Sequence, residues 1–241
     1  MKGKACFILP TYNERENVGS VVRGVFGECK ALGVEATVLV VDDHSPDGTA
    51  VEVVKLQRSF PQLKLLQRPA KEGLGKAYVA GFKWALANTD CDVLFEMDAD
   101  GSHDPAYLKA FFAKLAEGND VVVGSRYMPG GRHEQSPLHR TLISYGANYL
   151  IKALLALPLT DVTSGYRAIR RGALEKLDLN AFRSNGYEFQ LELLHKLHHS
   201  GARIGKTPIV FTPRARGRSK MTFGDMASFL WLALRLWLNR N

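Results

Sequence analysis

This 241-residue chain has too few cysteines, too widely spaced, to build a disulfide framework. Cys6, Cys29 and Cys91 also form no C-x-x-C pair of the kind that binds zinc, so we expect a reducing compartment. The N-terminus runs directly into an apolar, strand-like segment and lacks the apolar length and cleavage pattern of a signal peptide. No internal repeat or low-complexity linker divides the chain. These absences favour one large α/β domain that buries its core without covalent staples.

Acidic residues are nearly missing from the last part of the chain. From Gly201 onward there are eight Lys or Arg and one acid, Asp225, so this tail carries +7 of the net charge of +8. A basic tail indicates a partner with phosphate groups, such as a phosphorylated substrate or an anionic membrane. A nucleic-acid-binding domain is the alternative from another class, but its cations are typically interleaved with aromatics. The basic stretch 214–220 has no aromatic, so we expect no nucleic acid partner.

Short apolar runs alternate with longer helical patterns along the chain. The pattern predicts strands at 5–9, 36–41, 63–66, 93–97 and 121–123, and helices at 17–32, 49–60, 75–87 and 105–117. Further helices are expected at 138–159, 186–200 and 223–238. Near-continuous apolar strands separated by helices indicate an α/β fold with a mostly parallel central sheet and helices on both faces.

Two carboxylates stand one residue apart directly after the strand expected at 93–97. Asp98 and Asp100 flank Ala99, and unpaired carboxylates this close would repel each other and raise each other's pKa. A divalent cation removes that cost, since Mg²⁺ or Mn²⁺ prefers carboxylate oxygen and completes its shell with water and substrate phosphate. The pattern therefore predicts a site where a metal meets a diphosphate, with a solvated acidic turn as the alternative.

Polar residues also follow the first two strands. Asp42 and Asp43 end the second strand, and a simple turn would need only one Asp, so we expect one of them to contact a nucleotide. Tyr12 and Glu14 follow the first strand, where Tyr12 can stack on a base and Glu14 can accept its hydrogen bonds. Ligands of such sheets bind at the carboxyl ends of the strands, so these residues are expected near Asp98.

A glycine pair precedes the helix expected at 75–87. Gly73-Leu74-Gly75 resembles the opening of a dinucleotide fingerprint, but Tyr78 stands where the third glycine belongs. We therefore reject a nicotinamide cofactor. The glycines are expected to permit a close backbone approach or to begin the helix.

The stretch 223–238 is dense in Phe, Leu and Trp. It is shorter than the roughly 20 apolar residues that span a bilayer. Trp231, Trp237 and the flanking arginines suit a helix lying in the membrane interface, with packing on the domain's own core as the alternative. The cationic loop before it, 214–220, can close over a pyrophosphate.

Seven stretches of the chain resemble the family 2 glycosyltransferases with a GT-A fold, and among them the polyprenyl-phosphate (dolichyl-phosphate) mannose synthases. They are LPTYNERENV (9–18), VVDDHSPDGT (40–49), KEGLGKAYVAGFKWA (71–85), EMDADGSHDP (96–105), VVVGSRY (121–127), DVTSGYRAIRR (161–171) and FTPRARGRSKM (211–221). The resemblance implies a nucleotide-diphospho-sugar transferase fold over 1–221. Residues 222–241 would then form a C-terminal amphipathic helix of the same domain.

The resemblance implies roles for individual residues on the donor side. The residues that would hold the nucleotide are Pro10, Tyr12, Glu14, Val41 and Asp43. The residues that would lie along the diphosphate or clamp the donor are Asp98, Ala99, Asp100, Arg126, Arg214 and Lys220. Asp98 and Asp100 would hold Mg²⁺ or Mn²⁺, and Ser102 is the third candidate ligand because many relatives carry a metal-contacting Gln there.

The implied reaction is inverting transfer of mannose from GDP-mannose to a polyprenyl (dolichyl-type) monophosphate, giving a glycolipid. Arg140 and Ser144 would receive the lipid phosphate, and Asp98, Asp100, Arg126 and Arg140 would control charge during transfer. A phosphate monoester is largely dianionic near neutrality, so no general base is expected. A transferase that uses UDP-glucose or another UDP-sugar on the same scaffold is the alternative.

Some members of this family continue into C-terminal transmembrane helices, whereas this sequence stops at Asn241. We therefore expect a peripheral protein on the cytoplasmic face of a membrane. Its anchor would be the terminal helix or a small separate transmembrane subunit.

Overall fold

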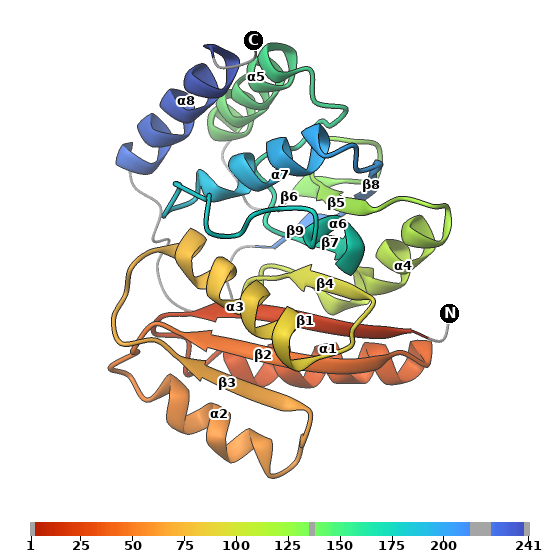
Figure 1. The fold of residues 1–241 in the computed structure, drawn as a ribbon, viewed down its shortest axis with the longest axis vertical. Helices are drawn as coiled ribbons and strands as arrows, with labels where there is room; N and C mark the ends of the chain where they lie inside the picture. Colours follow the sequence, from red (N-terminus) through yellow and green to blue (C-terminus); the bar gives the residue numbers. More distant parts are fainter. Residues whose placement is uncertain (1–2, 135–137, 213–222, 239–241) are drawn as a thin grey trace.

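A seven-stranded sheet forms the centre of the protein in a computed structural model that describes residues 3–134, 138–212 and 223–238 (Figure 1). Its strands, in spatial order, are β3 (Leu63–Gln67), β2 (Glu35–Asp42), β1 (Lys4–Thr11), β4 (Val93–Glu96), β7 (Arg167–Arg170), β5 (Val121–Ser125) and β8 (Ile204–Pro208). All neighbouring pairs are parallel except those of β7, which runs antiparallel to β4 and β5. The expected mostly parallel sheet is confirmed.

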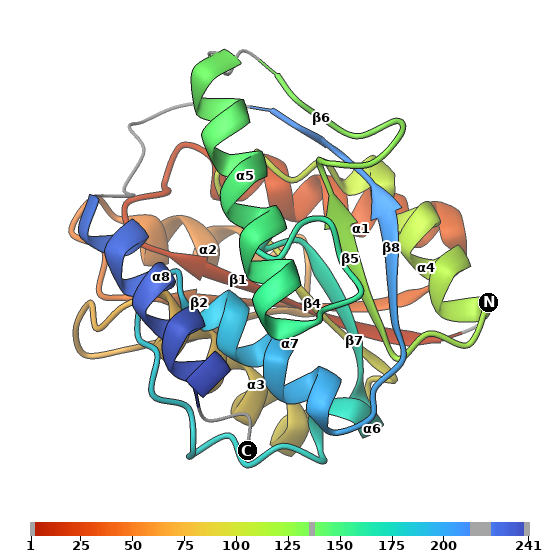
Figure 2. The same cartoon turned by 90° about the horizontal axis from the view of Figure 1, so that it is seen from above.

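Helices cover both faces of this sheet, which explains why its strands are apolar on both sides. One face packs against α3 (Leu74–Asn88) and α7 (Phe189–His199). The other packs against α1 (Val18–Leu32), α2 (Thr49–Gln57) and α4 (Leu108–Ala116). Figure 2 shows the sheet between these two layers.

Several helix boundaries follow from local chemistry. The Asp104 side chain accepts a hydrogen bond from the Ala106 backbone amide and caps the 3₁₀ turn η1 (Pro105–Tyr107) that leads into α4. Asp47 likewise accepts from the Thr49 amide at the start of α2. The long helix α5 (Leu138–Leu155) ends before the expected residue 159, because Ala156 adopts a left-handed conformation with φ of 49°.

Some elements were not predicted from the sequence. They are β7, β8, the short helix α6 (Arg171–Leu174) and a two-stranded sheet of β6 (Arg132–His133) and β9 (Val210–Phe211). The strand β7 has the sequence RAIR, in which the two arginines hide the apolar pattern of a central strand. Its position is set by pairing with β4 and β5 rather than by local propensity.

Gly73 and Gly75 permit a close backbone approach, as expected from the sequence. Gly73 has φ of 109°, a conformation that side chains rarely adopt. The Gly75 amide donates to the Asn185 carbonyl at 2.8 Å, and a Cβ at Gly75 would lie 2.5 Å from the Ser184 carbonyl oxygen. The start of α3 therefore lies directly against a segment that is more than one hundred residues away in sequence.

The helices α5 and α8 (Phe223–Leu238) pack side by side at one end of the molecule, at the top of Figure 1. Leu232 and Ala233 of α8 are buried in the same apolar cluster as α3 and α7. Among the helices that the structure describes, none has the length and hydrophobicity required to cross a bilayer.

Gly81 lies where α3 packs closely on the sheet, so a substitution there measures how tight this packing is. A Cβ there would lie 2.5 Å from Ile8 Cγ2 and 3.2 Å from Val41 Cγ2. We predict that Gly81→Ala lowers the free energy of unfolding by about 1–3 kcal/mol, because the core is close-packed. Gly27→Ala is the matched control in the exposed part of α1, where nothing lies within 4 Å, and should raise stability by about 0.5–1 kcal/mol. Urea denaturation measures both, and a Gly81→Ala protein as stable as the Gly27→Ala protein would contradict this packing.

Candidate functional site

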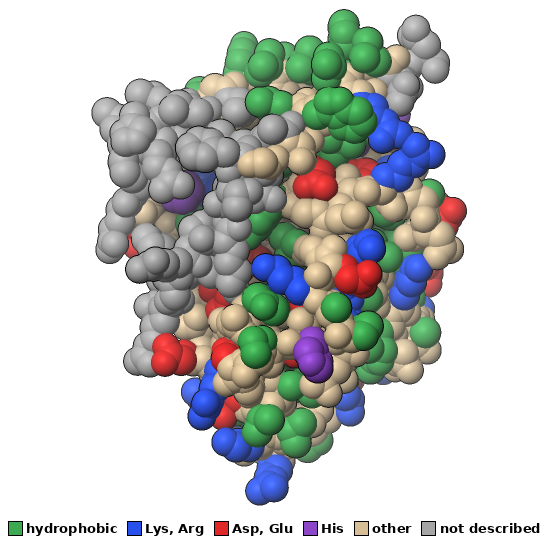
Figure 3. Space-filling model, turned by 90° about the vertical axis from the view of Figure 1, so that its left-hand side faces the viewer, with side chains coloured by type: hydrophobic (Ala, Val, Ile, Leu, Met, Phe, Trp, Pro, Cys, Tyr) green, Lys and Arg blue, Asp and Glu red, His purple; other side chains and the backbone are tan. Residues whose placement is uncertain are grey.

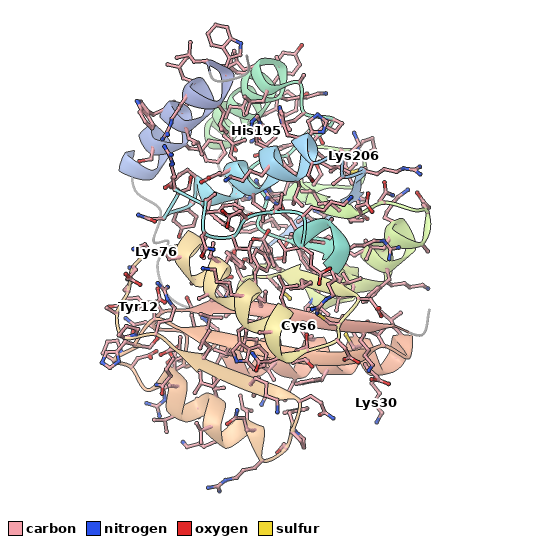
Figure 4. The ribbon with its side chains drawn as sticks, in the orientation of Figure 1. Cys6, Tyr12, Lys30, Lys76, His195 and Lys206 are labelled. Atoms are coloured by element: carbon pink, nitrogen blue, oxygen red, sulfur yellow. The ribbon has the colours of Figure 1, made fainter. Side chains whose placement is uncertain are left out.

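A cavity of about 240 Å³ opens at the carboxyl ends of β1, β2 and β4. It is lined by Pro10, Thr11, Tyr12, Glu14, Asp43, Lys71, Gly73, Leu74, Ala77, Asp98, Ala99, Asp100, Gly186 and Tyr187. Figure 4 shows Tyr12 and Lys76, near the start of α3, on the same side of the molecule. The structure therefore gathers most of the residues that the sequence predicted for the donor. Val41 is different, because its side chain is fully buried and packs in the core.

The adjacent acids Asp42 and Asp43 serve different purposes. Asp42 is fully buried and stabilises the turn after β2, since it accepts hydrogen bonds from Thr11 Oγ1 at 2.9 Å and from Ser45 Oγ at 2.6 Å. Asp43 lines the cavity instead. One acid thus holds the turn that presents the other.

Arg68 binds the Asp43 carboxylate. Its Nη1 donates to Asp43 Oδ1 at 2.6 Å, and its Nη2 donates to Glu72 Oε2 at 2.6 Å. Burial raises the pKa of the Asp43 carboxyl above its ordinary value, and Arg68 opposes this effect. Beside them, Lys71 Nζ lies 4.4 Å from the centre of the Tyr12 ring. This end of the cavity combines a carboxylate, an aromatic face and a cation.

Asp98 and Asp100 lie on the loop after β4. The Asp98 side chain is 35% exposed, whereas Asp100 is 5% exposed. Ser102 donates to Asp100 Oδ1 through both its amide at 3.0 Å and its hydroxyl at 2.6 Å. In this structure Ser102 therefore orients Asp100, and its role as a third metal ligand stays a prediction.

His103 holds the loop that carries Asp98 and Asp100 through a hydrogen bond to its backbone. Its Nδ1 accepts a hydrogen bond from the Asp98 backbone amide at 3.0 Å, and its Nε2 lies 3.8 Å from Asp98 Oδ2. The imidazole is buried and stacks on Tyr166, and burial lowers its pKa to about 4. A neutral imidazole with Nδ1 as acceptor matches this geometry.

The donor set around Asp98 fits a hard divalent cation with open positions. Both carboxylates line the cavity, and hard cations such as Mg²⁺ are typically held by one or two carboxylates with substrate phosphate and water. Within the described ranges, no group of three or more His, Cys, Asp or Glu is arranged to hold a metal alone. Two carboxylates would leave most positions around such a cation to substrate phosphate and water.

A buried polar layer lies next to the loop 98–103 that carries Asp98 and Asp100. The fully buried Arg167 donates to the carbonyls of Ser164 at 2.8 Å, Gln190 at 2.6 Å and Val162 at 3.0 Å. Its Nε lies 3.8 Å from Glu96 Oε2, two residues before Asp98. Burial raises the pKa of Glu96 to about 7. Arg167 thereby joins β4, the loop 161–166 and the start of α7.

Arg126 forms a buried ion pair next to this layer. Its Nε and Nη2 each donate to Asp161 at 2.7 Å, and Nη2 also donates to Thr163 Oγ1 at 2.7 Å. Its Nη1 lies 3.2 Å from His133 Nε2. Burial opposes the charge on the guanidinium, but Asp161 dominates and raises the pKa of Arg126. The predicted contact of Arg126 with phosphate is not tested by this geometry.

The expected acceptor side begins beside Arg126. The Tyr127 hydroxyl donates to Ser144 Oγ on α5 at 2.6 Å, and the Arg126 guanidinium lies 5.3 Å from the centre of the Tyr127 ring. Ser144 is therefore linked to Arg126 through one aromatic side chain. The Arg140 side chain and the loop residues Arg214 and Lys220 lie outside the described residues.

Sequence reasoning missed part of the cavity wall. The lining residues that were not predicted to bind a ligand are Thr11, Lys71, Gly73, Leu74, Ala77, Gly186 and Tyr187. Gly73 and Gly75 predict a close backbone approach at the start of α3, but they do not indicate which segment packs there. Gly186 and Tyr187 arrive from a distant segment, and no local pattern marks them as part of the site.

The chain matches the family model "Glycosyl transferase family 2" over residues 6–178. It is 44% identical over 216 residues to polyprenol monophosphomannose synthase of Mycolicibacterium smegmatis, covering 89% of this chain and 80% of that protein. It is 42% identical over 217 residues to undecaprenyl-phosphate mannosyltransferase of Micrococcus luteus, covering 90% of this chain and 87% of that protein.

Solved structures show the same fold at low sequence identity. Glucosyl-3-phosphoglycerate synthase from Mycobacterium tuberculosis, in complex with Mn²⁺, UDP and phosphoglyceric acid, has a TM-score of 0.69 at 20% identity, covering 99% of this chain and 78% of its own. Mannosyl-3-phosphoglycerate synthase from Rubrobacter xylanophilus has a TM-score of 0.68 at 17% identity. The match covers 99% of this chain and 74% of that protein. These likenesses confirm the expected GT-A fold.

The ion pair between Arg126 and Asp161 should dominate the acid stability of this region. We predict that Asp161→Asn lowers the free energy of unfolding by about 3–5 kcal/mol at pH 7, since it leaves a buried guanidinium without its counter-charge. Burial raises the pKa of the Asp161 carboxyl, but Arg126 outweighs it and lowers the pKa below its ordinary value.

The pH dependence of the difference in unfolding free energy between wild type and Asp161→Asn is a second measurement. Because the folded-state pKa lies below the unfolded value of about 3.9, the contribution of Asp161 is complete above that pH. It is lost as the pH falls through the lowered folded-state pKa. The stability gap between wild type and Asp161→Asn should therefore narrow below about pH 4. A gap that stays constant down to pH 2 in urea denaturation would contradict the ion pair.

Proposed function

The chain belongs to glycosyltransferase family 2, and on that premise we propose that it transfers mannose from GDP-mannose to a polyprenyl (dolichyl-type) monophosphate with inversion. The observation that carries the proposal is the cavity at the strand ends. Asp98, Asp100, Tyr12 and Asp43 all line this cavity, and we assign its end at Tyr12 and Asp43 to the base of the donor. On the acceptor side, the hydroxyl of Tyr127, which follows Arg126, donates to Ser144 on α5. The names of two relatives at 42% and 44% identity support the same acceptor class.

The chemistry requires charge control rather than a base. An oxygen of the lipid phosphate attacks the anomeric carbon of mannose, and the bond from that carbon to the diphosphate oxygen breaks. A phosphate monoester has a second pKa of about 6, so the attacking oxygen already carries negative charge near neutrality. The catalytic task is to bring two anions together in line and to stabilise the charge that develops on the leaving GDP.

The chain's residues divide this task. Asp98 and Asp100 would hold Mg²⁺ or Mn²⁺, which when bound offsets negative charge on the diphosphate. Ser102 orients the Asp100 carboxylate, and His103 holds the backbone at Asp98. Arg140 and Ser144 would receive the lipid phosphate. Arg126 would contact phosphate on the donor side, where Arg214 and Lys220 would add positive charge.

An apolar surface on α5 and α8 supports peripheral binding to a membrane. Its exposed side chains are Tyr145, Tyr149, Leu150, Leu230, Trp231, Leu234, Trp237 and Leu238. Figure 3 shows hydrophobic side chains gathered at this end of the molecule. Trp231 is 62% exposed, and Arg235 lies 5.5 Å from the centre of its ring. Tryptophan beside arginine is typical of a helix in the headgroup region, where the lipid phosphate also lies.

The transfer reaction has a direct test. The purified chain is incubated with GDP-mannose or a UDP-sugar, Mg²⁺ or Mn²⁺, and a short polyprenyl phosphate, and the glycolipid is identified by mass spectrometry. The proposal expects a polyprenyl-phosphate hexose from GDP-mannose. A product from UDP-glucose alone would replace mannose with glucose, and the absence of any glycolipid would overturn the proposal.

Asp100→Asn should abolish this product. The amide retains an oxygen that can accept from Ser102, while the charge that would hold the metal is lost. We expect turnover to fall by roughly 100-fold or more, since a Lewis-acid metal contributes several kcal/mol and each 1.36 kcal/mol is tenfold in rate. Asp90→Asn, at an exposed acid paired with Lys4, is the control and should retain turnover. Near-normal turnover by Asp100→Asn would remove the metal hypothesis.

Membrane binding is tested by sedimentation with vesicles that contain phosphatidylglycerol. Trp231→Glu and Tyr149→Glu should each reduce the bound fraction, because they place a charge on the apolar surface of α5 and α8. Val51→Glu is the control, since Val51 is also exposed but lies on α2, at the other end of the molecule in Figure 1. If wild type does not sediment with vesicles, the apolar surface fits a separate transmembrane subunit instead. Equal binding by wild type and all three variants would leave the helices without a role in membrane attachment.

A further inference from the structure

We propose that Arg68 is a positioning residue that fixes the Asp43 carboxylate against the donor's base and thereby sets which base the cavity accepts. The inference rests on the proposed function, because it concerns how the donor site of that reaction distinguishes one nucleotide from another. Arg68 directly follows β3 and does not itself line the cavity.

The contacts of Arg68 join three parts of the cavity wall. Its backbone amide donates to the Asp42 carbonyl at 2.8 Å, in continuation of the pairing between β2 and β3. Its guanidinium binds Asp43 with one nitrogen and Glu72 with the other, each at 2.6 Å. Glu72 Oε1 in turn lies 3.2 Å from Lys76 Nζ on α3. One side chain thus fixes the end of β2 relative to the loop 68–73.

The placement of this pair favours an orienting role over a purely stabilising one. The Arg68 side chain is 8% exposed and that of Asp43 is 7% exposed, so both have lost most of their water. A buried ion pair contributes little net stability, because desolvation consumes most of the attraction. Its geometric effect is larger, since Arg68 Nη1 holds Asp43 Oδ1 while Nη2 of the same rigid guanidinium is held by Glu72.

The loop that Arg68 holds contributes its own contacts to the cavity. Lys71 and Gly73 line it, and Lys71 lies over the Tyr12 ring. Glu72, between them, is the residue that Arg68 binds. Loss of the Arg68 guanidinium should therefore leave the Asp43 carboxylate free to rotate at this end of the cavity.

The chemistry of the bases makes the proposal specific. An ionised carboxylate only accepts hydrogen bonds, and its two oxygens can accept two parallel N–H donors. Guanine presents such a pair on one edge, at N1 and the 2-amino group. Hypoxanthine lacks the 2-amino group, and uracil presents one N–H. Asp43 held in an ionised, fixed orientation should therefore prefer guanine, whereas a freely rotating carboxylate should discriminate less.

The test is calorimetric binding of GDP, IDP and UDP to the full chain with Mn²⁺. Wild type should bind GDP about tenfold or more tightly than IDP, because a hydrogen bond to a charged group is lost. In Arg68→Gln the ratio of the GDP and IDP affinities should fall to about three or less, while IDP affinity changes little. Asp43→Asn should behave in the same way, and Arg68→Lys should retain part of the ratio. Arg58→Gln, the same change at an exposed position at the end of α2, is the control and should bind as wild type.

Three outcomes would overturn the role of Arg68. One is equal weakening of GDP and IDP binding by Arg68→Gln, which marks a structural effect. The second is an unchanged ratio of the GDP and IDP affinities in Arg68→Gln. The third is a wild type that binds GDP, IDP and UDP equally well. If Arg68→Gln fails to fold by circular dichroism, Arg68→Lys and Asp43→Asn decide in its place.

The same titrations separate this inference from the proposed function. A wild type that prefers UDP over GDP would overturn the GDP donor. In that case, loss of the UDP preference in Arg68→Gln would still support Arg68 as the positioning residue, and its retention would overturn that role. A chain that shows the GDP preference but yields no mannolipid would overturn the reaction alone.

Discussion

Like-charged carboxylates crowd the edge of the sheet where the parallel strands end, and the structure of the site depends on how their charge is balanced. Asp43, Asp100 and Asp161 are all nearly or fully buried there. Asp43 and Asp161 each receive an arginine from the chain, at 2.6 Å and 2.7 Å. Asp98 keeps about a third of its surface open, at 35% exposure. Fixed arginines thus balance the charge of two of these buried acids, Asp43 and Asp161.

The acids are held in place because segments distant in sequence pack closely beside them. The close contact of Gly75 with the segment 184–189 brings Tyr187 to the cavity. Arg167 joins the loop before β7 to the start of α7 through backbone carbonyls. These contacts explain how segments from different halves of the chain meet at one cavity.

The sequence was sufficient for the features that depend on local pattern. Alternating apolar runs predicted the strands β1 to β5, and the doubled acids after β2 and β4 predicted the location of the cavity. Pairings between distant residues carried no such signal. Nothing adjacent to Arg126 indicates that Asp161 binds it, and nothing near Asp43 singles out Arg68 among the basic residues. Ser102 shows the same limit. Its neighbours in sequence place it on the loop after β4, but they do not predict the direction of its hydroxyl.

The reversed strand β7 has a consequence for the insert between β5 and β7. Because β7 runs opposite to β4 and β5, its first residue lies at the edge where those strands end, and the loop 161–166 joins the site there. Everything between β5 and β7, including α5, forms one excursion that leaves and re-enters the sheet at this edge. Its buried residues, among them Ile151 and Leu155, belong to the same apolar cluster as Ile8 of β1 and Leu39 of β2. A single change of strand direction thus brings both ends of this insert to the edge where β4 and β5 end.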